Sequence, residues 1–328
     1  MTKLILDMPI LGIDVSKLDL SISLLIDNKY YQTEIDNNQD GFKLLDKWLK
    51  TYKITKTKAC MESTGNYGKA FANYLHGNNH DVHIVNPSCI NAFAKSKLLR
   101  QKTDKVDSKI IAEYAAKNEL QKFIPKDKTH QELQDLYRCL QNLKEHKKQT
   151  DNYLENKEHL PKSVCDSYKN IAKYIIKQMK IIESKIDNLV TNHFVIKQQI
   201  NNMQTIPGIG KLTAVAILAE TPDLKSFTNA RELAAYAGLT PKHKISGTSV
   251  RGRSSISKIG SSSLRKTLYF PAIVAKNHNP IFFKFVQKLG SKGKAKKVII
   301  VAIMRKLLHI IFGVIKNNSA FNPDFAID

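Results

Sequence analysis

The chain has 328 residues, of which 42% are hydrophobic and 25% charged, and these ordinary values argue against wholesale disorder. Its net charge of +23 indicates a polyanionic partner. The start of the chain does not resemble a secretory signal. No apolar run is expected to be long enough to span a bilayer, because the longest, residues 298–314, is interrupted by Arg305, Lys306 and His309, so no membrane is expected. Four scattered cysteines without a CxxC pair predict reduced thiols in the cytoplasm.

The positive charge is concentrated in the last third of the chain. Residues 1–127 and residues 128–200 each carry a net charge of +4, whereas residues 201–328 carry +15. Residues 233–323 contain 17 Lys and Arg and no acid. A solvated surface usually mixes both signs, so this run predicts phosphate neutralisation with steep salt dependence. Attraction to a membrane surface is the weaker alternative, because the basic residues also lie in Gly/Ser-rich loops.

Residues 1–127 are predicted to form a mixed sheet covered by helices. Alternating apolar residues across 11–26 predict a β-hairpin with one buried face. The elements expected after it are strands at 30–35, 57–61 and 82–85, and helices at 41–52, 67–76, 88–99 and 105–117. A strand meander followed by alternating strands and helices is the layout of a ribonuclease-H-like fold.

Four carboxylates in this half are candidates for a metal site. Asp14 lies inside the first apolar strand, where an unpaired charge is costly and a cation would stabilise it. Glu62 ends the strand at 57–61, and Asp104 and Asp107 lie on one face at the start of a helix. Such oxygen ligands suit Mg²⁺ or Mn²⁺, which can organise phosphodiester cleavage. Taken singly, however, Glu62 could cap the next element, and Asp104 and Asp107 could simply favour the helix dipole.

Residues 128–200 contain no Gly and a single Pro, with apolar residues spaced by three or four. This pattern predicts two long helices, broken near 159–164, that form an antiparallel hairpin or a dimerising coiled coil. An ordinary helical linker is the alternative. Partner packing is favoured because a narrow apolar stripe on a long helix needs a cover.

Residues 201–328 are predicted to form a mainly helical, basic domain. The motif Pro207-Gly208-Ile209-Gly210 between two helical segments resembles a helix-hairpin-helix, whose backbone N–H groups could bind phosphate, although it could also be a plain packing turn. Further helices are expected at 230–237, 264–275, 281–288 and 296–315.

A Gly/Ser-rich basic loop at 238–263 offers hydroxyls beside Arg251 and Arg253. One of them could attack a phosphate whose charge the arginines neutralise. The serines could equally only donate hydrogen bonds to phosphate, and the residue types alone favour that second reading. His243 is a possible proton acceptor, but a lone loop histidine is usually just exposed.

Taken together, the motifs resemble those of the DEDD transposases of bacterial insertion sequences, the insertion sequence one-ten family. In the first half the resemblance rests on Gly12-Ile13-Asp14-Val15-Ser16-Lys17, Met61-Glu62-Ser63-Thr64-Gly65 and Lys102-Thr103-Asp104-Lys105-Val106-Asp107. In the second half it rests on Ile206-Pro207-Gly208-Ile209-Gly210, Ala237-Gly238-Leu239-Thr240-Pro241, Ser246-Gly247 and Ser257-Lys258-Ile259-Gly260 through Leu264-Arg265. The motifs span nearly the whole chain in the family's order.

The resemblance implies a RuvC-like nuclease domain at 1–127, a coiled-coil region at 128–200 and a C-terminal transposase domain at 201–328. It implies that Asp14, Glu62, Asp104 and Asp107 bind the metal and that Ser246 is the nucleophile, with Ser249 as the fallback. It also implies donor and target duplex DNA as substrates, a guide RNA from the element, and dimers that pair into tetramers. The residues expected to bind nucleic acid are Gly208, Gly210, Lys211, Arg251, Arg253, Lys258, Arg265 and Lys266.

The expected activity is therefore site-specific DNA recombination through a covalent phosphoserine. Two rivals remain open. One is a metal-dependent junction endonuclease in which water attacks, and the other is a nucleic-acid-binding protein without catalysis.

Overall fold

The computed structural model describes residues 8–63, 65, 67–98, 103–155, 157–242, 245–246, 250–251 and 255–323. The chain divides into two compact units, Met1–Pro125 and Lys126–Asp328, each of which is described separately below. The helices expected for residues 128–200 belong to the second unit and share its core.

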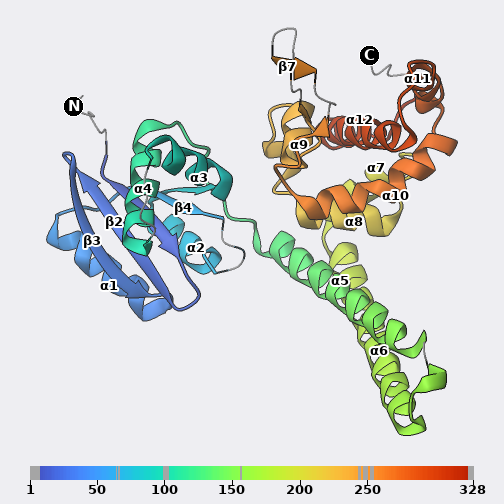
Figure 1. Ribbon diagram of the computed structural model, residues 1–328, viewed down its shortest axis with the longest axis horizontal. Helices are drawn as coiled ribbons and strands as arrows, with labels where there is room; N and C mark the ends of the chain where they lie inside the picture. The colour runs from blue at the N-terminus through green and yellow to red at the C-terminus, as the bar shows by residue number, and fades with distance from the viewer. Residues whose placement is uncertain are drawn as a thin grey trace. The chain divides into compact units, whose positions relative to one another are not determined.

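The first unit contains a mixed five-stranded sheet, as the sequence predicts (Figure 1). The strands are β1 (Ile10–Val15), β2 (Asp19–Ile26), β3 (Lys29–Asp36), β4 (Lys58–Glu62) and β5 (Asp81–Val85). Their spatial order is β3-β2-β1-β4-β5, in which β1 pairs antiparallel with β2 and parallel with β4. The first strand in the sequence therefore lies at the centre of the sheet.

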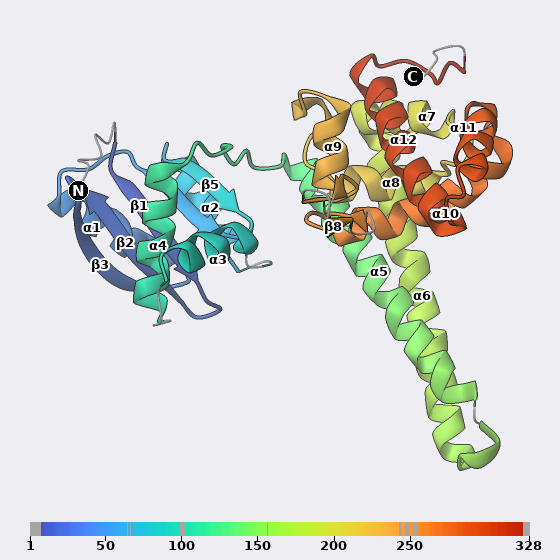
Figure 2. The same ribbon diagram turned by 45° about the horizontal axis from the view of Figure 1, so that its top comes forward.

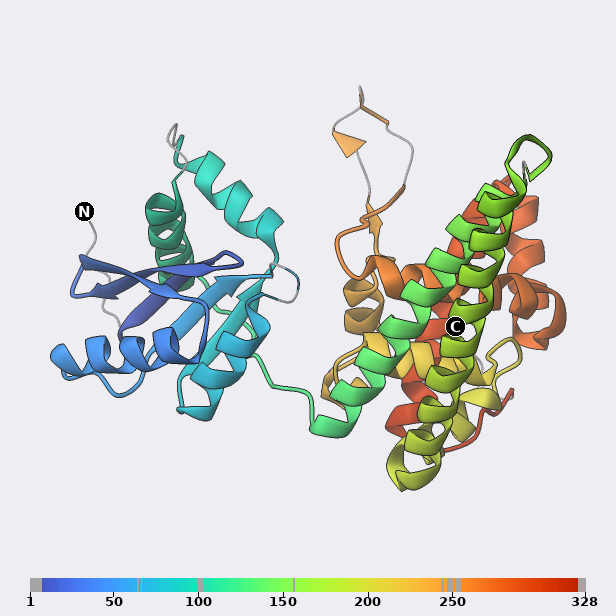
Figure 3. The ribbon, with the colours of Figure 1, turned by 90° about the horizontal axis from the view of Figure 1, so that it is seen from below.

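Helices cover both faces of this sheet (Figure 3). They are α1 (Gln39–Thr51), α2 (Lys69–Gly77), α3 (Pro87–Ser96) and α4 (Asp104–Lys117). Successive side chains of a strand point to opposite faces. Leu11 and Ile13 accordingly join the core under α1 and α2, whereas Ile10 belongs to the core under α3 and α4.

Two buried histidines of this unit predict acid sensitivity. Burial lowers the pKa of His80, whose Nδ1 lies 2.9 Å from Thr57 Oγ1. Burial also lowers the pKa of His83, whose Nδ1 lies 2.9 Å from the Gln121 carbonyl oxygen. Because both folded pKa values lie below the ordinary value of about 6.5, the unfolded chain binds more protons. Stability should therefore fall as the pH drops below about 6.5.

The single tryptophan, Trp48, packs against the core of this unit and reports its unfolding. Urea unfolding followed by Trp48 fluorescence should show a lower midpoint at about pH 5 than at about pH 8. Asp81 does not contribute to the change in stability between these two pH values. Burial raises its pKa, but the hydrogen bonds from Lys122 and Lys56 outweigh burial and bring the pKa below 3.8. The double variant His80→Gln/His83→Gln should show a flatter pH dependence; an unchanged dependence would contradict the assignment.

The second unit is helical apart from one short-stranded arm (Figure 1). Its helices are α5 (Lys128–Glu155), α6 (Lys162–Asn192), α7 (Phe194–Gln204), α8 (Lys211–Glu220), α9 (Ala230–Tyr236), α10 (Ser262–His278), α11 (Pro280–Ser291) and α12 (Lys296–Lys316). The sequence predicts these helical segments, except that it does not predict the break at His193 that separates α6 from α7. Their apolar faces meet in one core.

Helices α5 and α6 form a long antiparallel hairpin that projects from the helical body of this unit (Figure 2). Leu133 and Leu140 of α5 and Ile186 of α6 lie in the shared core near the body. Towards the other end, the rings of Tyr153 and Tyr168 stack with centroids 5.0 Å apart. The hairpin was one of the expected alternatives, and each of its helices covers part of the other's apolar stripe.

Helix α12 corrects the expectation that no apolar run in this chain is long enough to span a bilayer. Within the described residues, it is the one helix that meets the length and apolarity of a membrane span, despite Arg305 and Lys306. Ile303, Leu307 and Ile311 of α12 are fully buried in the core of the second unit. Its apolar character is accounted for by this packing.

Candidate active site

Asp14 and Glu62 occupy neighbouring positions on adjacent strands. Strands β1 and β4 are parallel, and their last paired residues are Ile13 and Met61. The next residue on each strand is one of the two acids. Both side chains are half-buried, and both lie on the face that carries Cys60 and the contacts of α4. Two of the four predicted carboxylates are therefore brought side by side by strand pairing.

Helix α4 lies across this same face, and Gly12 explains how closely it approaches. A Cβ atom on Gly12 would lie only 2.1 Å from the Ser108 carbonyl oxygen and 2.3 Å from the Ala112 backbone nitrogen. The Ser108 hydroxyl lies 3.0 Å from the hydroxyl of Ser23 on β2. Only glycine fits at position 12, so this residue sets the distance between the sheet and α4.

The direction of α4 brings its first turn towards Asp14. Lys58, which pairs with Ile10 at the start of β1, donates to the Asn118 carbonyl oxygen just beyond the end of α4. Gly12 contacts the middle of α4 at Ser108. Helix α4 therefore runs antiparallel to β1, and its N-terminal turn lies towards the Asp14 end of the strand.

Asp104 and Asp107 lie in this first turn, which Thr103 caps by accepting from the Val106 backbone N–H at 3.3 Å. Asp104 and Asp107 share a helix face with Ser108 and Ile111, which point into the sheet. Asp107 is half-buried and Asp104 is exposed. All four predicted acids thus lie on the side of the sheet that α4 covers, towards the carboxyl ends of β1 and β4.

The acids do not form a closed metal cluster in this arrangement. Among the described residues, no group of three His, Cys, Asp or Glu side chains lies close enough to hold a metal ion. The donor chemistry nevertheless suits a hard divalent cation, because all four candidates offer only carboxylate oxygens.

Ser246 lies on an arm of short strands between α9 and α10. β6 (Pro241–Lys242) pairs with β9 (Ser255–Ile256), and β7 (Ile245–Ser246) pairs with β8 (Val250–Arg251). These strands replace the irregular loop expected from the sequence, because two-residue strands are too short to show alternation. His243, Ser249 and Arg253 lie outside the described residues, as do the side chains of Ser246 and Arg251.

The base of the arm is fixed by Arg265, which the sequence marks as a nucleic-acid-binding residue. Its Nη1 lies within hydrogen-bonding distance of three carbonyl oxygens, those of Ala237 at 2.9 Å, Gly260 at 3.3 Å and Ser261 at 3.4 Å. Lys258 adopts a positive φ of 57° and donates its backbone N–H to Gly238. These contacts make Arg265 a residue that positions the arm.

Gly260 permits the tightest approach at this base. Its φ is +136°, and a Cβ atom there would lie 2.3 Å from the Tyr236 carbonyl oxygen. That same oxygen accepts from the Ser261 backbone N–H at 2.8 Å. The beginning and the end of the arm are therefore held against each other.

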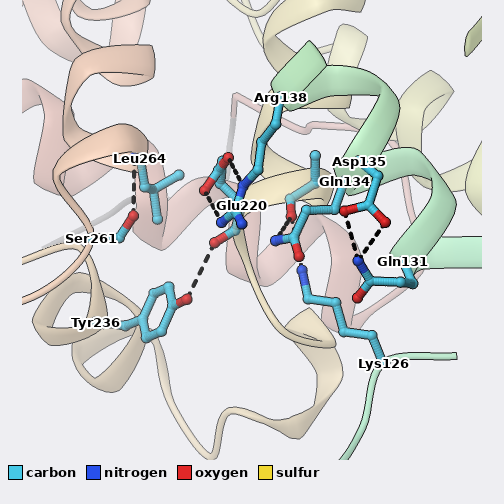
Figure 4. Close-up of polar contacts among 10 residues, drawn as sticks. Lys126, Gln131, Gln134, Asp135, Arg138, Glu220, Tyr236, Ser261 and Leu264 are labelled. Carbon is cyan, nitrogen blue, oxygen red and sulfur yellow. Dashed lines mark hydrogen bonds and ion pairs between the residues drawn. The ribbon is translucent and has the colours of Figure 1, made fainter. Parts of the chain in front are cut away.

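A half-buried ion pair between Arg138 and Glu220 connects this region to α5 (Figure 4). Glu220, 6% exposed at the end of α8, accepts from Arg138 Nε at 3.1 Å and Nη2 at 3.2 Å. This hydrogen bonding raises the pKa of Arg138. The Tyr236 hydroxyl donates to the Glu220 carbonyl oxygen at 3.2 Å. The contacts run from the projecting hairpin through α8 to the base of the serine arm.

Sequence reasoning missed Arg138, Glu220 and Tyr236. The available signal was Glu220 itself, a lone acid at the end of the apolar run Ala214–Ala219, because a charge buried there needs a partner. Its partner lies 82 positions away, and no local spacing pointed to it.

The predicted helix-hairpin-helix is a tight turn between α7 and α8. Gly208 has a φ of +101°, and a Cβ atom there would lie 2.9 Å from the Pro271 carbonyl oxygen of α10. Gly210 is exposed at the N-terminus of α8, where Lys211 forms an ion pair with Asp187 at 2.7 Å. Gly208 thus serves close packing, and Gly210 and Lys211 lie at the surface. Lys266 is exposed on α10.

Comparison with known proteins finds matches along the chain. Residues 200–287 match the transposase IS116/IS110/IS902 family, and residues 11–161 match the DEDD transposase family of IS110. The pilin gene-inverting protein of Moraxella bovis is 35% identical over 315 residues, which cover 95% of this chain and 97% of that protein. The protein of the same description from Moraxella lacunata matches to the same extent. The transposase for insertion sequence element IS1328 of Yersinia enterocolitica is 24% identical over 215 residues, covering 58% and 62% of the two chains.

Proposed function

This chain belongs to the IS116/IS110/IS902 family of transposases and cuts and rejoins DNA, and from that premise we propose that the four carboxylates bind a divalent metal and that Ser246 attacks the phosphodiester. The observation that supports the metal site is that Asp14 and Glu62 each follow the last paired residue of the adjacent strands β1 and β4, with the first turn of α4 directed to the same end of the face. We further propose that the first unit, Met1–Pro125, has a ribonuclease-H-like fold, which its strand order β3-β2-β1-β4-β5 supports.

In the proposed reaction, the Ser246 hydroxyl gives up its proton and its oxygen bonds to phosphorus as the bond to one deoxyribose oxygen breaks. The released deoxyribose oxygen takes up a proton. Attack by a second strand's hydroxyl on the phosphoserine then forms a new phosphodiester and restores the serine. Asp14, Glu62, Asp104 and Asp107 would hold Mg²⁺ or Mn²⁺, which when bound stabilises negative charge on the phosphate and on the leaving oxygen.

The proposed partners are donor and target duplex DNA, a guide RNA from the element, and further copies of the chain. The net charge of +15 in residues 201–328 supports a nucleic-acid partner. The α5–α6 hairpin offers a projecting surface for a second copy. We place the enzyme in the cytoplasm, where its DNA substrate lies.

The two Moraxella relatives favour a particular outcome of strand exchange. Both are described as inverting a pilin gene, and the alignment covers 97% of their length. Inversion of a DNA segment between two sites is therefore a second candidate beside transposition. A plasmid that carries two sites in inverted orientation distinguishes the two outcomes. Inversion would reverse the segment between the sites, whereas transposition would move the element to a new location.

Trapping on a nicked DNA substrate tests the serine mechanism. We expect the wild-type protein to form a covalent adduct that survives denaturation, and Ser246→Ala to lose it while still binding DNA. Ser249→Ala is the matched control and should retain the adduct. Loss of the adduct in Ser249→Ala alone would move the nucleophile to Ser249. Cleavage without any adduct would support hydrolysis by water, and neither cleavage nor adduct would support a binding protein.

A further inference from the structure

Helix α10 carries an exposed aromatic face that the proposed chemistry does not use. The opposite face of α10, with Leu264, Leu268 and Ala272, is buried in the core. On the outer face, Phe270 is 74% exposed and Tyr269 is 38% exposed. A phenylalanine this exposed buries little apolar surface within its own unit, so this surface is suited to contact with another molecule.

Lysine and aromatic side chains share this face. Lys266, Phe270 and Val274 are spaced by four residues, which places them in one row along the helix. Lys266 is exposed, and Val274 is 45% exposed. The Tyr269 and Phe270 rings lie edge to face with centroids 5.8 Å apart. We call the surface formed by Lys266, Tyr269, Phe270 and Val274 the α10 aromatic face.

The positive charge of the chain around the α10 aromatic face indicates which class of molecule binds it. The α10 aromatic face lies within residues 233–323, which contain 17 basic residues and no acid. A second copy of the chain would bring the same positive field to the contact, so like charges oppose pairing of this face with itself. A polyanion is attracted instead. A partner that supplies both negative charge and flat apolar surfaces is a nucleic acid.

The aromatic rings select the form of that nucleic acid. Bases inside a duplex are stacked on one another and present only their edges, whereas unpaired bases can stack on an aromatic side chain. We propose that the α10 aromatic face is a stacking surface for unpaired nucleotides, with Phe270 contacting a base and Lys266 contacting the adjacent phosphate. This inference rests on the proposed function only in taking nucleic acid as the substrate.

Fluorescence anisotropy of the full-length protein tests this inference. The probes are labelled oligothymidine, labelled oligouridine and a labelled duplex. Phe270→Ala should bind the single strands about tenfold more weakly and bind the duplex with less than about a twofold change, because stacking is lost and phosphate contacts remain. Phe270→Trp should restore single-strand binding. A larger loss on oligouridine than on oligothymidine would assign the face to RNA, and the reverse would assign it to opened DNA.

Phe194→Ala is the matched control, because Phe194 is 76% exposed on a different helix, α7. It should leave single-strand affinity unchanged. Irradiation of an iodouracil-substituted strand should also join the strand to a peptide of α10, which checks the contact even where a variant folds poorly. Unchanged single-strand affinity in Phe270→Ala, or an equal loss on duplex, would overturn the inference. So would a change confined to self-association in sedimentation. None of these measurements requires strand cleavage, so their failure is separate from loss of the serine adduct.

Discussion

Asp14→Asn should reduce DNA strand cleavage by at least about 10³-fold, which corresponds to about 4 kcal/mol of lost transition-state stabilisation. The amide keeps the shape of the side chain but removes the charge that would hold a divalent cation beside Glu62. Affinity for DNA should change little, because most of the net positive charge, +15 of +23, lies in residues 201–328. Cleavage is measured on a labelled substrate with Mg²⁺ or Mn²⁺, and affinity by anisotropy.

Asp40→Asn is the control for this substitution. Asp40 lies in α1, which packs on the opposite face of the sheet, and its side chain is exposed. It should leave cleavage unchanged. Unfolding followed by Trp48 fluorescence should show both variants within about 1 kcal/mol of wild type. If Asp14→Asn cleaved and rejoined DNA at the wild-type rate, the proposed carboxylate site would be wrong.

The strands of the first unit were predictable because alternation is a local property. Residues 11–26 predict the positions of β1 and β2 correctly, but the expectation of a single buried face is wrong. Both faces of these strands are buried, because helices cover both sides of the sheet. The pairing of β1 with β4 depends on the order of strands in space, which no single strand encodes. The sequence therefore identified Asp14 and Glu62 as separate candidates, and strand pairing made them neighbours.

Contacts between distant residues explain what the sequence left undecided in the second unit. The family motif that contains Arg265 predicts that it binds nucleic acid, and the sequence does not reveal its contacts within the protein. Its three carbonyl acceptors depend on how the arm returns to α10. The role of Gly208 was similarly hidden, because its neighbour Pro271 belongs to another helix. The composition of a region can indicate its function. It does not show which residues bind nucleic acid and which make contacts within the protein.

Arg138→Met should destabilise the second unit by about 2–3 kcal/mol, less than the roughly 3–5 kcal/mol that breaking a fully buried ion pair costs. The substitution leaves the Glu220 carboxylate, 6% exposed, without its bidentate partner. The value is reduced because the Arg138 side chain is itself 44% exposed and partly solvated. Urea unfolding followed by far-UV circular dichroism measures the effect, since this unit is helical. Lys147→Met, which removes the half-buried Lys147–Asp151 pair within α5, is the control and should cost no more than about 0.5 kcal/mol, because Asp151 stays 47% exposed to water.

A double-mutant cycle measures the interaction energy between Arg138 and Glu220 apart from their contacts with other residues. Glu220→Gln removes the charge but can keep a hydrogen bond, so Arg138→Met/Glu220→Gln should be more stable than the sum of the two single effects predicts. A recovered coupling of about 1 kcal/mol or more would show that the cost of Arg138→Met arises from the uncompensated carboxylate. Additive effects would contradict this, because they would place the cost in lost packing of the arginine stem. Since Tyr236 contacts the Glu220 carbonyl oxygen, the same variants should also slow formation of the serine adduct, whereas Lys147→Met should not.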